Sequence, residues 1–220
     1  MSPRTTRICV IVAVIAALVT GGIVAWAQFY RLRYYSEVVP GQIYRSRQPA
    51  GLRYRVLADH NIKRDISLWE ETKFPAILAE EEAACKKAGA EFVQIPVLTA
   101  LPSTEQIERF MVAVRSSPGP VLVHCEHGRD RTGFMLAAYR VLMQDWPVEE
   151  AIQDQLVRFK ALLPPDKLAE IRSMLTEIKT NRQAWLDRTD PLRGGNSSRP
   201  DTSSAPASPA AMAASAAAAG

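Results

Sequence analysis

The middle of the chain alternates between short apolar segments and longer amphipathic ones. Four short segments contain β-branched residues and end at glycine, proline or polar residues, which predicts strands in VVPGQIYRS, IKRDISLW, EFVQIPV and VLVH. Helices are predicted between them, over residues 50–60, residues 74–88 and the segment that starts at Ser103. Ser103 is followed three residues later by Gln106, which is the pattern of a capping box. This alternation is typical of an α/β domain.

The last third of the chain is predicted to begin as helices and to end without structure. Helical spacing occurs over residues 132–144, 148–162 and 165–185. After Asp190 the chain has no aromatic and almost no large aliphatic residue, so it lacks the apolar surface that would offset the entropy lost on folding. We therefore predict three parts: an N-terminal segment over residues 1–33, one folded domain over 34–187 and a disordered tail over 188–220.

The N-terminal segment contains a long uncharged run, from Ile8 to Ala27. A membrane-spanning helix needs about 20 apolar residues, and Trp26 lies where an interfacial aromatic belt is expected. The run predicts a single-pass membrane anchor with the folded domain outside the cytoplasm, although two arginines after the run favour the opposite orientation. The alternative is a signal peptide cleaved after Ala-Trp-Ala, which would make the domain secreted or periplasmic.

Charge and cysteine content narrow the possible functions. A formal net charge of +4 is too small to indicate a nucleic-acid-binding protein. The three cysteines do not suggest a disulfide framework, and Cys9 and Cys85 fit buried thiols. Asp65 falls inside a predicted strand, which an edge position or a salt bridge would explain. The third cysteine, Cys125, does not fit a buried structural thiol.

Cys125 stands apart because of the sequence around it, VLVHCEHGRDRTG. The strand VLVH ends where ligands bind in open α/β folds, and the loop after it leads into a helix N-terminus. Backbone N–H groups in such a loop bind an anion and stabilise a thiolate. Gly128 and Gly133 allow close approaches that a side chain would block. Arg131 offers a planar pair of donors to phosphate oxygens, so the loop predicts attack of sulfur on phosphorus.

The stretch HCEHGRDRTG resembles the HC-x5-R-[ST]-G signature of the cysteine-dependent protein tyrosine and dual-specificity phosphatases. VVPGQIYRSRQPAG and IKRDISL also resemble segments of a bacterial, membrane-anchored or exported branch of that superfamily. The resemblance covers about residues 38–158. It implies an α/β fold with a mostly parallel sheet of four or five strands, flanked by helices.

The resemblance also implies a role for each residue of the signature. Cys125 is the expected nucleophile, Arg131 the phosphate clamp, and Thr132 the donor that helps the sulfur to leave. His124 is expected to orient the loop and to tune the thiolate. The phosphate-binding loop is completed by Glu126, His127, Gly128, Arg129, Asp130 and Gly133.

The general acid departs from the family pattern. Many relatives carry an aspartate on the loop after the strand equivalent to EFVQIPV, where this chain reads LTALPSTEQ, and Glu105 falls in the first turn of a helix. Asp130 is the nearest candidate, and its C-x4-D-R spacing resembles that of myotubularin-type lipid phosphatases. The alternative is that Asp130 only braces the loop. Glu70 and Glu71 are a second option for the acid.

The expected function is that of a membrane-anchored or exported phosphatase acting on phosphorylated protein. The first alternative is a lipid or inositol phosphate substrate, which Asp130, Arg129 and the apolar N-terminal segment favour. The alternative from another class is a pseudophosphatase, which binds phosphate without turnover. No nucleic-acid partner, cofactor or metal is expected, because His124, His127 and Cys125 lack the further ligand of a closed zinc site.

Overall fold

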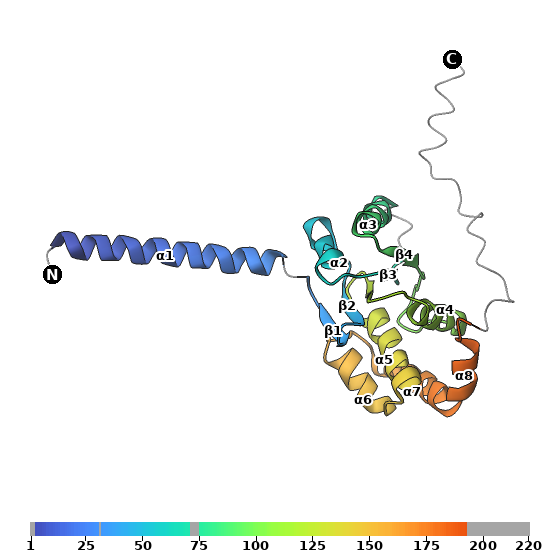
Figure 1. Ribbon diagram of the computed structural model, residues 1–220. Coiled ribbons are helices and arrows are strands. Elements are labelled where there is room, and N and C mark those ends of the chain that lie inside the picture. Colours follow the sequence, from blue (N-terminus) through green and yellow to red (C-terminus); the bar gives the residue numbers. More distant parts are fainter. Residues whose placement is uncertain (1–2, 31, 71–74, 193–220) are drawn as a thin grey trace, which may run out of the picture.

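The computed structural model describes residues 3–30, 32–70 and 75–192, and it has an α/β fold (Figure 1). Five strands form one sheet in the order β1-β2-β5-β3-β4. Their bounds are β1 (Ser36–Val39), β2 (Ile43–Arg47), β3 (Arg64–Ser67), β4 (Glu91–Gln94) and β5 (Val121–Cys125). β1 pairs antiparallel with β2, and the other neighbours are parallel. The predicted α/β class with a mostly parallel sheet is confirmed.

The register of the central strands brings the carboxyl ends of β2, β5 and β3 to one edge of the sheet. Arg47, the last residue of β2, lies directly opposite Cys125, the last residue of β5. Backbone N–H groups just beyond β2 and β3 continue the pairing: that of Gln48 donates to the Cys125 carbonyl at 2.9 Å, and that of Leu68 to the His124 carbonyl at 2.8 Å. Ligands of open α/β folds bind at this edge.

Helices cover both faces of the sheet (Figure 1). One face carries η1 (Gly51–Tyr54), α2 (Arg55–Asp59) and α3 (Pro75–Ala88), and the other carries α4 (Thr104–Arg115), α5 (Asp130–Gln144), α6 (Val148–Ile152), α7 (Pro165–Thr180) and α8 (Arg182–Arg188). Side chains of β5 alternate between the faces, because successive residues of a strand point to opposite sides. Val121 and Val123 pack against α4 to α8, whereas Leu122 packs against α2 and α3.

The helix boundaries differ from the prediction at two places. The segment predicted as one helix over 148–162 is α6 followed by a single π turn, η2 (Gln153–Val157), in which the Arg158 N–H donates to the Gln153 carbonyl at 3.0 Å. The helix predicted over 165–185 is interrupted at Asn181, whose φ of −101° and ψ of 28° are not helical. The capping box at Ser103 is confirmed, with backbone and side-chain bonds to Gln106 in both directions.

The N-terminal segment forms helix α1 (Pro3–Tyr30). Among the residues that the structure describes, no helix is both long and apolar enough to cross a membrane. A spanning helix needs about 20 consecutive apolar residues. The predicted single-pass membrane location is therefore wrong. Of the tail predicted over 188–220, residues 193–220 lie outside the described residues, and the predicted division into three parts stays a prediction.

Candidate active site

The sulfur of Cys125 lies where the central strand β5 passes into the loop before α5. Cys125 is the last residue of β5, and Asp130 is the first residue of α5. The Gly128 N–H donates to the Cys125 sulfur at 3.2 Å. The loop thus brings backbone donors and the positive end of a helix to the same sulfur atom.

The pKa of the Cys125 thiol is lowered even though the residue is only 1% exposed. Burial by itself raises this pKa, because a thiolate loses its hydration. The Thr132 side chain, the charge of Arg131 and the backbone N–H groups of Thr132 and Gly128 outweigh burial. The Thr132 hydroxyl does not meet the geometry of a standard hydrogen bond, so we attribute its effect to its dipole. A larger thiolate fraction at neutral pH makes Cys125 the better nucleophile.

Two glycines let the loop pack closely against its neighbours. Gly128 has a φ of +69°, and a Cβ atom on it would lie 2.3 Å from the Ser46 carbonyl oxygen on β2. A Cβ atom on Gly133 would lie 2.7 Å from the Gln155 carbonyl oxygen. Both neighbours are backbone atoms, which cannot move aside without shifting a strand or a turn. The close approaches predicted for these two glycines are therefore present.

Replacing Gly128 by alanine is expected to lower the free energy of unfolding by about 3 kcal/mol or more, because left-handed strain and a backbone clash add together. Gly41 is the matched control, since its φ is +66° and nothing lies within 4 Å of the place that a Cβ atom would take. Gly41→Ala should cost only about 1–2 kcal/mol, from strain alone. Urea denaturation of both variants checks this. Equal losses would show that the contact with Ser46 does not constrain the loop.

Arg45 supports the loop from within the core and was not predicted from the sequence. Its guanidinium donates to the Gly128 carbonyl at 2.8 Å and to the Gln155 carbonyl and side-chain oxygens at 2.8 and 2.7 Å. Burial lowers the pKa of Arg45 to about 9, which leaves it charged at neutral pH, while the Cys125 thiolate acts in the opposite direction. The available signal was an arginine inside a predicted strand, next to the apolar residues that begin β2. Arg45 is a positioning residue for the loop.

Arg131 lies beside the Cys125 loop in the first turn of α5. Its guanidinium donates to the Val97 carbonyl at 3.3 Å and lies 3.6 Å from the Glu126 carboxylate. The side chain is 17% exposed, so part of the guanidinium group contacts protein and part of it is accessible to a ligand. This position agrees with the predicted phosphate clamp.

His124 is buried between two carboxylates on the α2–α3 face of the sheet. Its Nε2 atom lies 3.1 Å from the Asp65 carboxylate and 2.8 Å from the Glu81 carboxylate. Burial by itself lowers the pKa of His124, but the charges of Glu81 and Asp65 outweigh burial and raise it well above the usual value. The salt bridge explains the acidic residue noticed in strand β3, which is not at the sheet edge. Glu81 was missed, because it lies on a helix with several other glutamates.

Asp65, Glu81 and His124 also form a group, among the described residues, whose ligand atoms all lie within 4.8 Å of one another, as a metal site requires. The distances of 2.8 and 3.1 Å from the ring nitrogen to the carboxylates are those of ion pairs, although neither contact has the geometry of a hydrogen bond. An imidazolium ion shared by the two carboxylates therefore accounts for the cluster. The cluster lies at the end of β5, directly before the loop.

The candidates for the general acid lie in different surroundings. Asp130 accepts a hydrogen bond from the Leu162 N–H at 2.7 Å through one oxygen, and its other oxygen makes no hydrogen bond to a described residue. Glu70 follows β3 and has one buried carboxylate oxygen without a partner. Glu105 lies in the first turn of α4 and is exposed. Glu71 lies outside the described residues.

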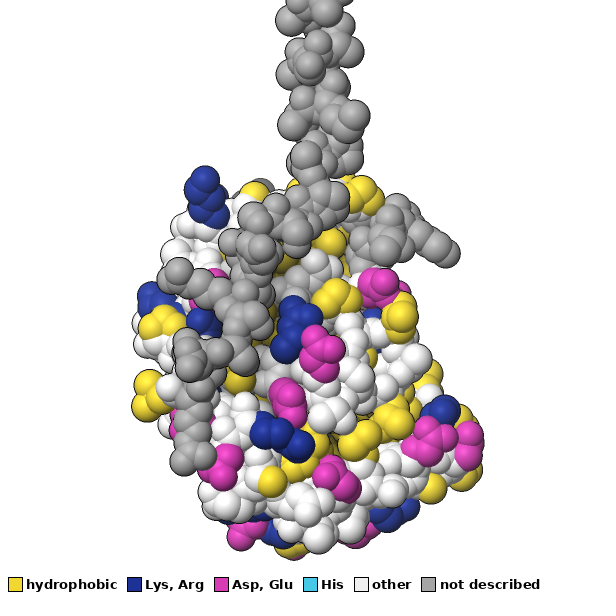
Figure 2. All heavy atoms as spheres, turned by 90° about the vertical axis from the view of Figure 1, so that its right-hand side faces the viewer, with side chains coloured by type: hydrophobic (Ala, Val, Ile, Leu, Met, Phe, Trp, Pro, Cys, Tyr) yellow, Lys and Arg dark blue, Asp and Glu magenta, His cyan; other side chains and the backbone are white. Residues whose placement is uncertain are grey.

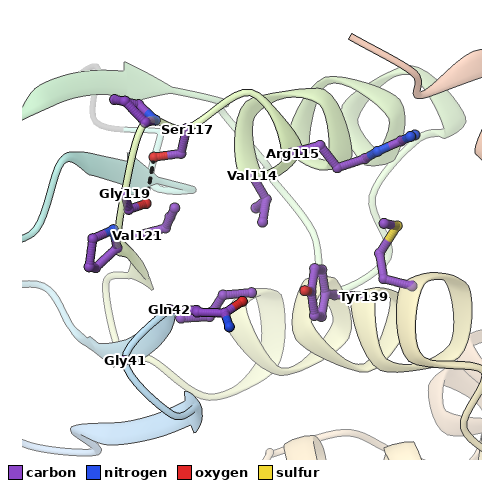
Figure 3. A pocket seen from close by; sticks show the side chains of 12 residues that line it. Gly41, Gln42, Val114, Arg115, Ser117, Gly119, Val121 and Tyr139 are labelled. Carbon is purple, nitrogen blue, oxygen red and sulfur yellow. Dashed lines mark hydrogen bonds between the residues drawn. The ribbon is translucent and has the colours of Figure 1, made fainter.

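A separate pocket of about 490 Å³ lies at the opposite edge of the sheet (Figure 3). It is lined by the first residues of β2 and β5, Ile43 and Val121, together with Arg115 and Tyr139. A strand rises about 3.3 Å per residue, so this pocket lies about 13 Å along β5 from Cys125. It is therefore not part of the Cys125 loop.

The fold and the loop define the class of this protein. A central parallel strand ends in a cysteine of lowered pKa, backbone donors face its sulfur, and an arginine and a threonine follow at the start of a helix. These features are those of the cysteine-dependent protein tyrosine and dual-specificity phosphatases, and the chain is related to enzymes of that class.

Comparisons with known proteins agree with this class. Residues 40–145 match the family described as a polymorphic toxin system DSP-PTPase phosphatase. The chain is 29% identical over 132 residues to phosphatidylglycerophosphatase and protein-tyrosine phosphatase 1 of Mus musculus, which covers 56% of this chain and 67% of the relative. The resemblance stated from the signature is thereby confirmed.

Two solved structures show the same fold. PTPMT1 in complex with PI(5)P aligns with a TM-score of 0.55 and 24% identity, over 67% of this chain and 98% of that chain. A variant of Pseudomonas aeruginosa TpbA in complex with pTyr aligns with a TM-score of 0.51 and 19% identity, over 64% of this chain and 86% of that chain.

Proposed function

We propose that Cys125 attacks the phosphorus of a phosphate monoester and forms a cysteinyl-phosphate intermediate. The observation that carries this proposal is the lowered pKa of Cys125 at the end of the central strand, with the Gly128 N–H at 3.2 Å from the sulfur. In this step the S–P bond forms while the P–O bond to the leaving group breaks, and the leaving oxygen takes up a proton. Water then attacks phosphorus, and the sulfur leaves as a thiolate.

Arg131 and the loop donors are proposed to stabilise the transition state of both steps. The three non-bridging oxygens would accept hydrogen bonds from the guanidinium and from the N–H groups of residues 126–131. Donors that are already oriented need no reorganisation during the reaction, which makes them effective. Thr132 would donate to the sulfur as it leaves. His124 and Arg45 act as positioning residues, since they contact the loop or its base but face away from the substrate side.

The proposed substrates are phosphorylated proteins or lipid and inositol phosphates. The name of the mouse relative includes both phosphatidylglycerophosphatase and protein-tyrosine phosphatase, and the two solved relatives hold PI(5)P and pTyr. Within this chain, the partly exposed Arg129 in the loop favours a substrate with additional negative charge. This observation supports the inositol phosphate class as the second candidate.

Turnover separates an enzyme from a phosphate-binding pseudophosphatase. The full chain is expected to hydrolyse p-nitrophenyl phosphate without added metal, to be inhibited by vanadate and to be insensitive to EDTA. Binding of phosphate without release of p-nitrophenol would instead establish the pseudophosphatase.

Asp130 is proposed to donate the proton to the leaving oxygen. Its second carboxylate oxygen makes no hydrogen bond to a described residue, and Asp130 starts the helix that carries Arg131. The bond from the Leu162 N–H supports the rival role, a brace between the loop and the segment after η2. Asparagine distinguishes the two roles, because its amide oxygen still accepts from Leu162 but the side chain has no acidic proton.

Asp130→Asn is expected to lower kcat/KM for phosphotyrosine by about 10²–10⁴-fold, the usual contribution of a general acid. The loss with p-nitrophenyl phosphate should be much smaller, because p-nitrophenolate leaves without a proton. Asp130→Ala is the control, since it removes the brace as well. If Asp130→Asn were nearly neutral with both substrates while Asp130→Ala impaired both, Asp130 would be a brace and Glu70 the next candidate.

A further inference from the structure

Two arginines outside the signature lie beside the Cys125 loop. Arg47 ends β2 directly opposite Cys125 in the parallel register. Neighbouring strands lie about 4.8 Å apart, so the backbones of these two residues are adjacent. The Arg47 N–H donates to the Arg33 carbonyl at 2.9 Å, which ties the segment before β1 to the same edge. Strand β2 and the segment before β1 therefore place two additional arginines beside the candidate active site.

These arginines line a cavity that the loop itself closes on one side. Its volume is about 80 Å³, and its walls are Arg33, Tyr34, Arg47, His127 and Arg129. A larger pocket of about 490 Å³ shares Arg33, Tyr34 and Arg47 with it, and Gln48 lines that pocket as well. The two cavities are therefore neighbours, and they connect the phosphate-binding loop with the segment before β1. We call the five residues of the smaller cavity the arginine pocket.

No carboxylate of the described residues neutralises the positive charge of the arginine pocket. Among the described residues, no carboxylate lies within 4.0 Å of Arg33, Arg47 or Arg129, whereas other arginines, such as Arg55 and Arg172, pair with a carboxylate. The Nε atom of Arg129 is buried without a hydrogen-bond partner. The face shown in Figure 2 has basic and acidic side chains interspersed.

Tyr34 adds a second indication that the arginine pocket is built for a ligand. Its φ of +57° is unusual for a large side chain, and such strain is found mainly at functional sites. The Arg33 guanidinium lies 3.4 Å from the Tyr34 hydroxyl. Partial burial acts to raise the pKa of Tyr34, but the hydrogen bonds and charges of Arg33 and Arg129 lower it overall. The hydroxyl and the guanidinium groups thus converge on one space.

We infer that the arginine pocket binds a second phosphate group of the substrate whose first phosphate reacts at Cys125. The inference rests on the function proposed for Cys125 and specifies its substrate class: a compact polyol, such as an inositol ring, that carries at least two phosphate groups. Guanidinium groups bind phosphate oxygens in pairs, and no described carboxylate competes for them. The adjacency of Arg47 and Cys125 favours two phosphates that are close together on one small molecule. The ring is recognised alike in a water-soluble inositol phosphate and in a lipid headgroup.

The test compares substrates with one and with two phosphates. For the full chain, kcat/KM with an inositol bisphosphate should exceed that with an inositol monophosphate by about tenfold or more, mainly through KM. In the double variant Arg33→Gln/Arg47→Gln this ratio should fall by about tenfold. Arg172→Gln on α7, which removes one exposed arginine outside the pocket, is the control and should leave the ratio within about twofold. An unchanged ratio in the double variant would overturn the inference.

Two further arms identify the source of a failure. If the full chain does not hydrolyse even p-nitrophenyl phosphate, the proposed function fails. The pocket is then tested by calorimetry on Cys125→Ser, in which the bisphosphate should bind about tenfold more tightly than the monophosphate. This preference should disappear when Arg33 and Arg47 are replaced by glutamine. The same substitutions are also assayed with a short-chain diacyl phosphoinositide bisphosphate. Equal effects on soluble and lipid substrates support ring recognition. An effect on the lipid alone would assign these arginines to the lipid surface and overturn the inference.

Discussion

Cys125→Ser is expected to lower kcat for p-nitrophenyl phosphate by about 10⁴-fold or more, as removal of a covalent nucleophile does in other enzymes. A serine hydroxyl stays protonated near neutral pH, and the groups that lower the pKa of the Cys125 thiol cannot bring a hydroxyl into the same range. Phosphate and vanadate should still bind, because the Gly128 N–H and Arg131 remain in place. Stopped-flow or endpoint release of p-nitrophenol, with calorimetry for phosphate, measures both properties.

Cys85→Ser is the matched control for the nucleophile. Cys85 is as buried as Cys125, but burial and the carboxylate of Asp65 raise the pKa of its thiol. Its sulfur lies 3.4 Å from the Asp65 carboxylate, and a serine hydroxyl can donate the same hydrogen bond. Cys85→Ser should therefore keep most of the activity. If Cys125→Ser retained more than a few per cent of the rate, the covalent mechanism would be wrong.

Arg131→Lys is expected to be nearly as damaging as Arg131→Ala, with a loss of kcat/KM of about 10²–10³-fold, comparable to removing a donor of an oxyanion hole. Lysine keeps the charge but has no planar fork for two phosphate oxygens. It also loses the contacts that orient the guanidinium, to the Val97 carbonyl and to Glu126. Steady-state kinetics on a phosphotyrosine substrate checks this.

Arg109→Lys serves as the control for Arg131. Arg109 is an exposed arginine of α4 with a single weak bond to the Gln94 carbonyl at 3.4 Å, so lysine should replace it with no measurable loss of activity. Recovery of most of kcat/KM by Arg131→Lys would mean that Arg131 acts only as a point charge, and the two-point geometry proposed for it would have to be abandoned.

The parts of the candidate site that are contiguous in sequence were predictable. The residues from His124 to Gly133 lie on one strand, one loop and one helix turn, and the structure places them together at the carboxyl end of β5. The capping box at Ser103 is equally local, since its partners are three residues apart. Local patterns are informative here because the hydrogen bonds they predict form within one turn or one loop.

The prediction of a membrane anchor from hydropathy was wrong. Hydropathy and length of the segment from Ile8 to Ala27 predicted a spanning helix, but no helix of the described residues meets both requirements. The break at Asn181 and the π turn of η2 were also missed, because helical periodicity continues through both places and their backbone geometry depends on packing against the rest of the domain.

By itself, the sequence determined the α/β alternation and the candidates for the nucleophile and the phosphate clamp, because each depends on residues that are close along the chain. Only the tertiary structure decided what surrounds them. Arg45 reaches the Gly128 carbonyl across 83 residues, Glu81 meets His124 from helix α3 on the same face of the sheet, and Arg47 lies beside Cys125. The physical reason is the parallel strand register, which sets these long-range contacts through backbone hydrogen bonds and face alternation.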